Sequence, residues 1–169
     1  MPIDIKPHAY DPATNPELFE GVLPRRVVAF IIDFIIIAVP VVLAAMFIFA
    51  FGVITLGLGF VLYALLSPGA VIWAILYFGV TLGGPHSATI GMRVVDLEMR
   101  TWYGAPAYFV LGAVHAIVFW LSVSMLSPFI LLVAFFNERR RLLHDILLGT
   151  VVINSPARAA ALRAIETGT

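Results

Sequence analysis

The uncharged stretches of this sequence limit its fold more than any other feature. No Asp, Glu, Lys or Arg occurs between Asp33 and His86, and a second stretch from Thr101 to Asn137 contains only His115 as a titratable basic group. A helix needs about 20 apolar residues to cross a bilayer, so the first stretch is long enough for two spans. Because backbone polar groups must be satisfied within lipid, we expect these spans to be helical.

The overall composition is also that of an integral membrane protein. Of the 169 residues, 62% are hydrophobic and only 12% are charged, whereas a soluble domain carries about 25% charged residues. The formal net charge is zero, which argues against nucleic acid as a partner. Cysteine is absent, which excludes disulfides and thiolate metal sites. We therefore expect the lipid bilayer as the main partner, and no motif calls for a cofactor.

Two spans are expected within the first stretch. The first covers residues 27–51 and contains Pro40, which predicts a kink. A glycine-rich turn over residues 52–59 follows. The second span covers residues 60–82 and is interrupted by Ser67-Pro68-Gly69, so it is bent or begins late.

Gly79 and Gly83 lie one helical turn apart near the end of the second span. Such a pair of small residues allows another helix to approach closely. The alternative is that the two glycines are incidental to a helix end.

The third apolar stretch, residues 107–136, is too long for one upright span and short for two. Basic residues flank every stretch, at Arg25-Arg26, Arg93, Arg100 and Arg139-Arg140-Arg141. Basic loops stay in the cytoplasm, so an even number of crossings keeps all three groups on that side. We expect an all-α membrane bundle with two full spans plus a hairpin turning near residues 122–128. The alternative is three spans, with the last one tilted.

We expect a multi-pass protein of a bacterial-type cytoplasmic (inner) membrane, and the same rule predicts that its N-terminus is in the cytoplasm. The expected parts are a polar, proline-rich arm over residues 1–24, a transmembrane domain over 25–153 and a soluble tail over 154–169. The arm does not have the composition of a secretory signal. Residues 138–153 fit a short helix at the inner interface, closed by Gly149.

Asp33 is the acidic residue that a membrane span should not contain. A charge facing hydrocarbon costs about 2.5 to 3.5 kcal/mol, so it must be paired, neutralised or solvated. Asp33 shares a helix face with Arg26 and Ala29, and the small side chain of Ala29 leaves room there. Since Arg26 is two turns away, we expect a partner from another helix and a basic companion.

Asp145 is the second unusual acid. It lies four residues after Arg141, so a local helical pair is the simpler interpretation. The functional interpretation brings Asp145, with His144, against Arg26 and Asp33 in a buried polar cluster near the cytoplasmic face. Such a cluster would also be explained by fold specification alone. No metal site is predicted, because adjacent residues such as His144 and Asp145 point in different directions on a helix.

Three segments together resemble one known family. The segments 25–33, 89–96 and 144–152 are similar, in order and spacing, to the motifs of the RDD family of small membrane proteins, which is named for one arginine and two aspartates. The resemblance implies that Arg26, Asp33 and Asp145 are the naming residues. It covers residues 20–153.

The central segment resembles the family's loop motif, with Thr89, Gly91 and Arg93 at its positions. Met92 departs from the family pattern, where lysine is more common, and this weakens any role for a positive charge there. What the resemblance implies about function is limited to a suggestion of transport.

Two functions follow as hypotheses. In the first, a transport-associated protein binds or relays a cation, a proton or a small ligand through Asp33 and Asp145, with His115 as a candidate proton relay. His115 is alternatively a hydrogen-bonded packing residue. So few spans make a small scaffold, so we expect a homo-oligomer or a larger membrane complex. In the second, the chain is a non-catalytic accessory or assembly subunit. An enzyme is not expected, because no zinc-protease or nucleophile-elbow motif is present.

Overall fold

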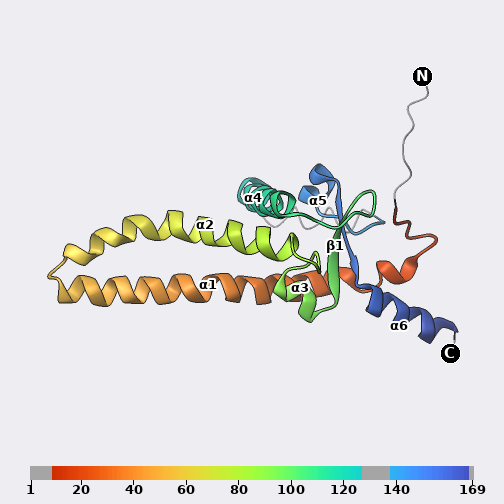
Figure 1. The fold of residues 1–169 in the computed structure, drawn as a ribbon, viewed down its shortest axis with the longest axis horizontal. Coiled ribbons are helices and arrows are strands. Elements are labelled where there is room, and N and C mark those ends of the chain that lie inside the picture. The colour runs from red at the N-terminus through yellow and green to blue at the C-terminus, as the bar shows by residue number, and fades with distance from the viewer. Residues whose placement is uncertain (1–8, 127–137, 168–169) are drawn as a thin grey trace, which may run out of the picture.

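The computed structural model describes residues 9–126 and 138–167, and Figure 1 shows their arrangement. In chain order the elements are η1 (Pro16–Leu18), α1 (Val22–Ile54), η2 (Leu58–Leu62), α2 (Tyr63–Leu82), α3 (Ile90–Val94), β1 (Leu97–Thr101), α4 (Phe109–Leu126), α5 (Leu143–Leu148), β2 (Thr150–Asn154) and α6 (Pro156–Thr167). A long helical hairpin forms one end, and the short elements gather at the other.

The hairpin consists of α1 and α2, which run antiparallel (Figure 1). Both are long and apolar enough to cross a membrane, and only 11% and 6% of their most apolar windows are buried within the structure. A core helix of a soluble protein would be mostly covered, so these faces suit lipid. The first predicted span, residues 27–51, falls within α1, and the second, residues 60–82, covers the end of η2 and all of α2. Pro40 and Pro68 both lie inside continuous helices, so α2 is not interrupted at Ser67-Pro68-Gly69 and begins before it, at Tyr63.

The turn between the two helices depends on its glycines, as the sequence predicted. Gly57 has a φ of 102°, which favours a residue without a side chain. A Cβ on Gly59 would lie 2.8 Å from the backbone nitrogen of Gly52. The chain therefore reverses with its backbone segments in direct contact.

The third apolar helix, α4, packs closely against α2. It is strongly foreshortened in Figure 1, so it runs across the hairpin and not along it. A Cβ on Gly79 would lie 2.7 Å from the ring of Phe109, and one on Gly83 would overlap the Phe109 backbone. The predicted close approach at this glycine pair is confirmed. The partner helix offers a small residue in return, since a Cβ on Gly112 would lie 2.8 Å from the carbonyl oxygen of Phe78.

The predicted hairpin in the third stretch differs from the structure at its start. Ser122 and Ser124 are helical residues of α4, which continues to Leu126, so no turn begins at Ser122. Serine in a helix interior can bond to its own backbone and needs no turn. Ser127, Pro128 and the returning arm lie outside the described residues. Two helices of membrane length and one shorter apolar helix are therefore described.

The expectation of an all-α fold is wrong in one respect, because β1 and β2 form a two-stranded antiparallel sheet. Leu97 pairs with Asn154 and Thr101 with Thr150. The β-branched run Val151-Val152-Ile153 favours a strand. Its partner is some fifty residues earlier in the chain, so the pairing was not apparent from local pattern. The short helix that precedes it, α5, does end at Gly149, whose φ is 64°, as predicted.

The sheet contributes residues to two hydrophobic clusters, one on each of its faces. The larger buried cluster lies where α1 begins and α2 ends, and comprises Val22, Leu82, Leu97, Met99, Ala107, Leu111 and Val152. On the other side, Phe19 packs against Val151 and Ile153. The α6 helix is tied to the N-terminal segment by an ion pair of 2.7 Å between Arg163 and Glu17. The described part of the arm and the tail therefore pack against the rest of the protein.

Candidate functional site

Asp33 is buried in α1, with 4% of its surface exposed. Its Oδ1 accepts hydrogen bonds from the Tyr77 hydroxyl at 2.5 Å and from the Gly91 backbone N–H at 2.8 Å. Its Oδ2 accepts a bond from the Thr89 hydroxyl at 2.6 Å. Three neutral donors thus replace the water that a carboxylate loses on burial.

These bonds attach α3 to α1. Thr89 is the N-cap residue of α3, and its oxygen also accepts the Met92 N–H at 3.1 Å. A Cβ on Gly91 would overlap the carbonyl oxygen of Ala29 and lie 2.9 Å from the Asp33 carboxyl carbon. The small residue Ala29, noted in the sequence, provides the facing surface. The contact therefore requires glycine at position 91.

The prediction that Asp33 has a basic companion is wrong. In the part of the chain that the structure describes, the hydrogen bonds to Asp33 come from Tyr77, Thr89 and Gly91, and none comes from an arginine. Arg93, the third residue of the predicted loop motif, donates instead to the Ala88 carbonyl at 3.1 Å. Nearby hydroxyl and amide donors supply what an arginine was expected to supply.

Arg26 pairs with the other buried aspartate. Its Nη1 lies 2.6 Å from Asp145 Oδ2, and Asp145 has no exposed surface. The same oxygen accepts the Leu142 N–H at 3.0 Å. Arg26 Nη1 also donates to the Arg140 carbonyl at 3.3 Å. The first turn of α1 is thereby joined to α5, more than a hundred residues later in the sequence.

The predicted local pair between Arg141 and Asp145 does not form. The guanidinium of Arg141 lies over the ring of Trp102, 3.9 Å from its centroid. Burial by itself would raise the pKa of Asp145, but the positive charge of Arg26, assisted by the neighbouring His144, lowers that pKa far below its usual range. Asp145 is therefore a carboxylate at neutral pH.

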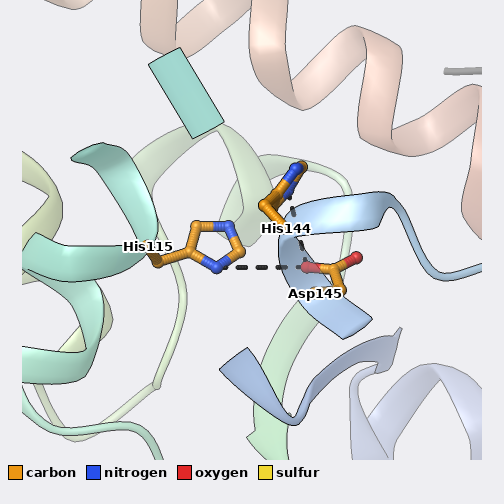
Figure 2. Close-up of side chains that lie close together, drawn as sticks. All are labelled: His115, His144 and Asp145. Atoms are coloured by element: carbon orange, nitrogen blue, oxygen red, sulfur yellow. Dashed lines mark ion pairs between the residues drawn. The ribbon is translucent and has the colours of Figure 1, made fainter. Parts of the chain in front are cut away.

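Two histidines face the free side of Asp145, as Figure 2 shows. His144 Nε2 lies 3.6 Å from Asp145 Oδ1, and His115 Nδ1 lies 3.9 Å from the same oxygen. The imidazole rings are 4.7 Å apart and nearly perpendicular. Burial lowers the pKa of His144, which favours its neutral form. Although His144 and Asp145 are adjacent on a helix and were expected to point in different directions, the His144 ring lies beside the Asp145 carboxylate (Figure 2).

A cavity of about 110 Å³ connects the surroundings of the two aspartates. Its polar lining combines residues of α1, α4 and α5 with the N-cap residue of α3, and Met92 also lies in its wall. The polar residues that line it are Arg26, Asp33, Thr89, His115, His144 and Asp145. The predicted cluster therefore exists as the lining of one cavity, although its two acids belong to separate hydrogen-bond networks.

Several polar atoms of this lining have no hydrogen-bond partner among the described residues. They are Arg26 Nε and Nη2, His115 Nδ1 and His144 Nδ1. Buried polar atoms are usually satisfied, by water where the space is sufficient. The Asp145 side of the cavity thus has unused donor and acceptor capacity, whereas each oxygen of Asp33 already accepts a hydrogen bond.

Sequence reasoning missed two residues of these networks. Tyr77 holds Asp33, and the Thr150 hydroxyl lies 3.4 Å from Asp145 Oδ1. Tyr77 carries a hydroxyl group within an apolar span, and this weakly indicates a hydrogen-bond partner inside the helix bundle. Thr150 lies in the segment 144–152 that carries the resemblance, but its contact with Asp145 could not be predicted, because its position depends on the sheet.

Comparison with known proteins adds one finding. The model of the RDD family matches residues 21–149, which is most of the chain and includes Arg26, Asp33 and Asp145. Searches of curated proteins and of solved structures returned no match. With this family match and two apolar helices of membrane length, the chain belongs to the RDD family and is a membrane protein.

Proposed function

We propose that this protein is transport-associated and exchanges a proton or a small cation at the Asp145 side of its cavity. The observation that carries the proposal is a cavity of about 110 Å³ that is lined by a carboxylate and two imidazoles with unpartnered atoms. Histidine is the side chain whose ordinary pKa suits proton exchange near neutral pH.

The surroundings of the cavity support a path toward the membrane. An apolar groove of about 520 Å³ lies between α1, α2 and α4. The groove and the cavity share Phe30, Asp33, Phe78 and Ala116 in their linings. Asp33 lies where the groove and the cavity meet, but both of its carboxylate oxygens already accept hydrogen bonds. We therefore assign a structural role to Asp33 and assign proton or cation exchange to His115, His144 and Asp145.

The distribution of charge supports a cytoplasmic position for the sheet end. Every arginine of the described residues belongs to the start of α1, to α3, β1 or α6, or to the segment just before α5. These segments gather at the end of the molecule that carries the sheet (Figure 1). By the positive-inside rule, this distribution favours the cytoplasmic side of a bacterial-type inner membrane for this end and for the start of α1.

The absence of native cysteine allows this orientation to be tested by single-cysteine labelling. Leu58, 80% exposed in the hairpin turn, and Ala160, exposed in α6, are suitable positions. We expect an impermeant maleimide to label Leu58→Cys in intact cells and Ala160→Cys only after permeabilisation. The reverse pattern would contradict the orientation.

Transport itself is tested with the full chain in liposomes. An imposed pH gradient should dissipate faster in proteoliposomes than in empty vesicles. The same measurement with an imposed sodium gradient tests whether a small cation is exchanged. His115→Gln should reduce the rate, whereas His86→Gln should not, because His86 is exposed and does not line the cavity. Equal rates for wild type and His115→Gln, or for wild type and empty vesicles, would reject the proposal.

An accessory or assembly role is the second candidate, and the closed network around Asp33 favours it. A buried acid with all of its oxygens bonded within the chain fastens helices together and needs no ligand. Purification in mild detergent distinguishes the two roles. A stoichiometric partner protein together with absent flux would favour the accessory role, and a homo-oligomer with flux would favour transport.

A further inference from the structure

We propose that His115, His144 and Asp145 bind a divalent transition-metal ion such as Zn²⁺. This inference goes beyond the proposed function, because metal binding is measured without any flux. It concerns the free side of Asp145, where the three side chains converge (Figure 2).

The distances suit a metal centre. One potential ligand atom from each residue lies within 4.8 Å of the other two, and the separations from Asp145 Oδ1 are 3.6 Å to His144 and 3.9 Å to His115. Two ligands of a tetrahedral zinc ion, each 2.0–2.1 Å from the metal, lie about 3.3 Å apart. The separations from Asp145 Oδ1 are longer than this by about 0.3 and 0.6 Å, and the two histidine nitrogens, within 4.8 Å of each other, would approach by up to about 1.5 Å. Rotation of the imidazole side chains would supply this movement.

The arrangement is held in place from outside the ligand set. Arg26 and the Leu142 N–H both bond to Asp145 Oδ2, which leaves Oδ1 facing the histidines with only a long bond from Thr150. A carboxylate oriented by hydrogen bonds on its far oxygen is a common feature of metal sites. Only 3% of the surface of His144 is exposed. Its ring packs edge-on against the ring of Phe119, with 5.2 Å between the two ring centroids.

The ligand chemistry selects the class of ion. Imidazole nitrogen suits zinc, copper, iron and nickel, whereas calcium and magnesium prefer oxygen ligands. Two imidazoles and a carboxylate therefore favour a first-row transition metal. Three protein ligands leave a further coordination position for water or an anion, as in open zinc sites.

The charge of Arg26 limits the affinity. Arg26 and Asp145 together are neutral, so a divalent ion gains less Coulomb energy here than beside a free carboxylate. The lone pairs of the neutral imidazoles then contribute a larger part of the binding. Loss of one histidine should consequently abolish measurable binding, and this makes the histidines the appropriate sites to change.

The test uses the full chain in detergent, purified with a tag that lacks histidine and stripped of metal by a chelator. Co²⁺ is the spectroscopic probe, because four- or five-coordinate Co²⁺ absorbs visible light far more strongly than the hexa-aqua ion. We expect wild type to saturate at about one equivalent of Co²⁺, in keeping with a single three-ligand site, and Zn²⁺ should displace it.

Three variants separate ligation from folding. His115→Gln should lose the Co²⁺ bands, while the matched variant His86→Gln should keep them. His144→Cys adds the only cysteine of the chain, so a new thiolate-to-cobalt charge-transfer band would identify position 144 as a ligand directly. Zn²⁺ should raise the Tm of wild type and leave that of His115→Gln unchanged.

Each outcome decides the proposal. Saturable bands that disappear in His115→Gln, together with the new band in His144→Cys, support it. Octahedral spectra, no saturable binding by wild type, or equal binding by wild type and His115→Gln would overturn it and leave a cavity that holds only water. Binding without flux rejects the proposed transport alone, and flux without binding rejects the metal site alone.

Discussion

Asp33 and Asp145 are both buried aspartates in the same protein, yet they are held by different means. Asp33 accepts bonds from three neutral donors, Tyr77, Thr89 and Gly91. Asp145 is paired with the Arg26 guanidinium at 2.6 Å and keeps Oδ1 toward two histidines. The first acid is enclosed by the fold, and the second presents one oxygen to a cavity.

The difference separates structure from chemistry within one set of family residues. A carboxylate whose oxygens are saturated by fixed donors has little capacity for a ligand and fastens α3 to α1. The carboxylate of Asp145 has a charged partner on one oxygen, and imidazoles with unpartnered nitrogen atoms lie beside the other oxygen. This second oxygen is therefore able to bind a ligand. We therefore expect changes at Asp33 to act on stability and changes around Asp145 to act on stability and ligand binding together.

The largest effect is expected from breaking the charged pair. Arg26→Gln leaves Asp145 as a buried charge without its main partner, so the free energy of unfolding should fall by about 3–5 kcal/mol. Thermal unfolding of the full chain in detergent, followed by tryptophan fluorescence, measures this. The double variant Arg26→Gln/Asp145→Asn should recover part of the loss. Strictly additive effects would show that the two residues are not coupled.

A somewhat smaller loss is expected from Asp33→Asn. The amide group of asparagine would face one of the donors that now bond to the carboxylate, which leaves a buried donor unsatisfied at a cost of about 3 kcal/mol. Asp96→Asn is the matched control, because Asp96 has 56% of its side chain exposed and its φ of 53° suits asparagine. If both variants unfold at the wild-type temperature, Asp33 does not fasten α3.

Gly91→Ala tests the same attachment without changing any charge. The added Cβ would overlap the Ala29 carbonyl oxygen, so α3 must shift away from Asp33, at a cost of about 2 kcal/mol. Gly69→Ala is the control, since a Cβ there meets open space within α2. A Gly91→Ala protein as stable as Gly69→Ala would show that the close approach is not required.

The smallest effect is expected from pH. Burial lowers the pKa of His144 in the folded protein, while the unfolded side chain titrates near 6.5. Between these values the unfolded chain binds more protons, so stability should fall as the pH drops below about 6.5. The pKa of Asp145 is also lowered, but its contribution is lost only in strong acid. Comparing the Tm of wild type and His144→Gln from pH 7.5 to 5.5 should show a flatter profile for the variant. Identical profiles would remove His144 as the cause.

The sequence by itself determined that this is a helical membrane protein and which acids lie in or beside its apolar stretches. Long uncharged apolar stretches require a lipid environment, and an acidic residue such as Asp33 within such a stretch must have a buried hydrogen-bonding or charged partner. Arg26 and Asp145 were correctly grouped in one predicted polar cluster, and the two side chains form an ion pair. These conclusions depend on composition and on charge position along the chain, which are properties of the sequence alone.

Only the tertiary structure decided which partner each acid has. The sequence marks Tyr77 only weakly and places Gly91 in a loop motif without indicating its partner. The pairing of β1 with β2 joins segments that lie far apart in the chain. His144 and Asp145 lie beside His115 because α5 packs against α4 (Figure 2). Contacts between distant segments depend on how the helices pack, and local periodicity carries no information about that packing.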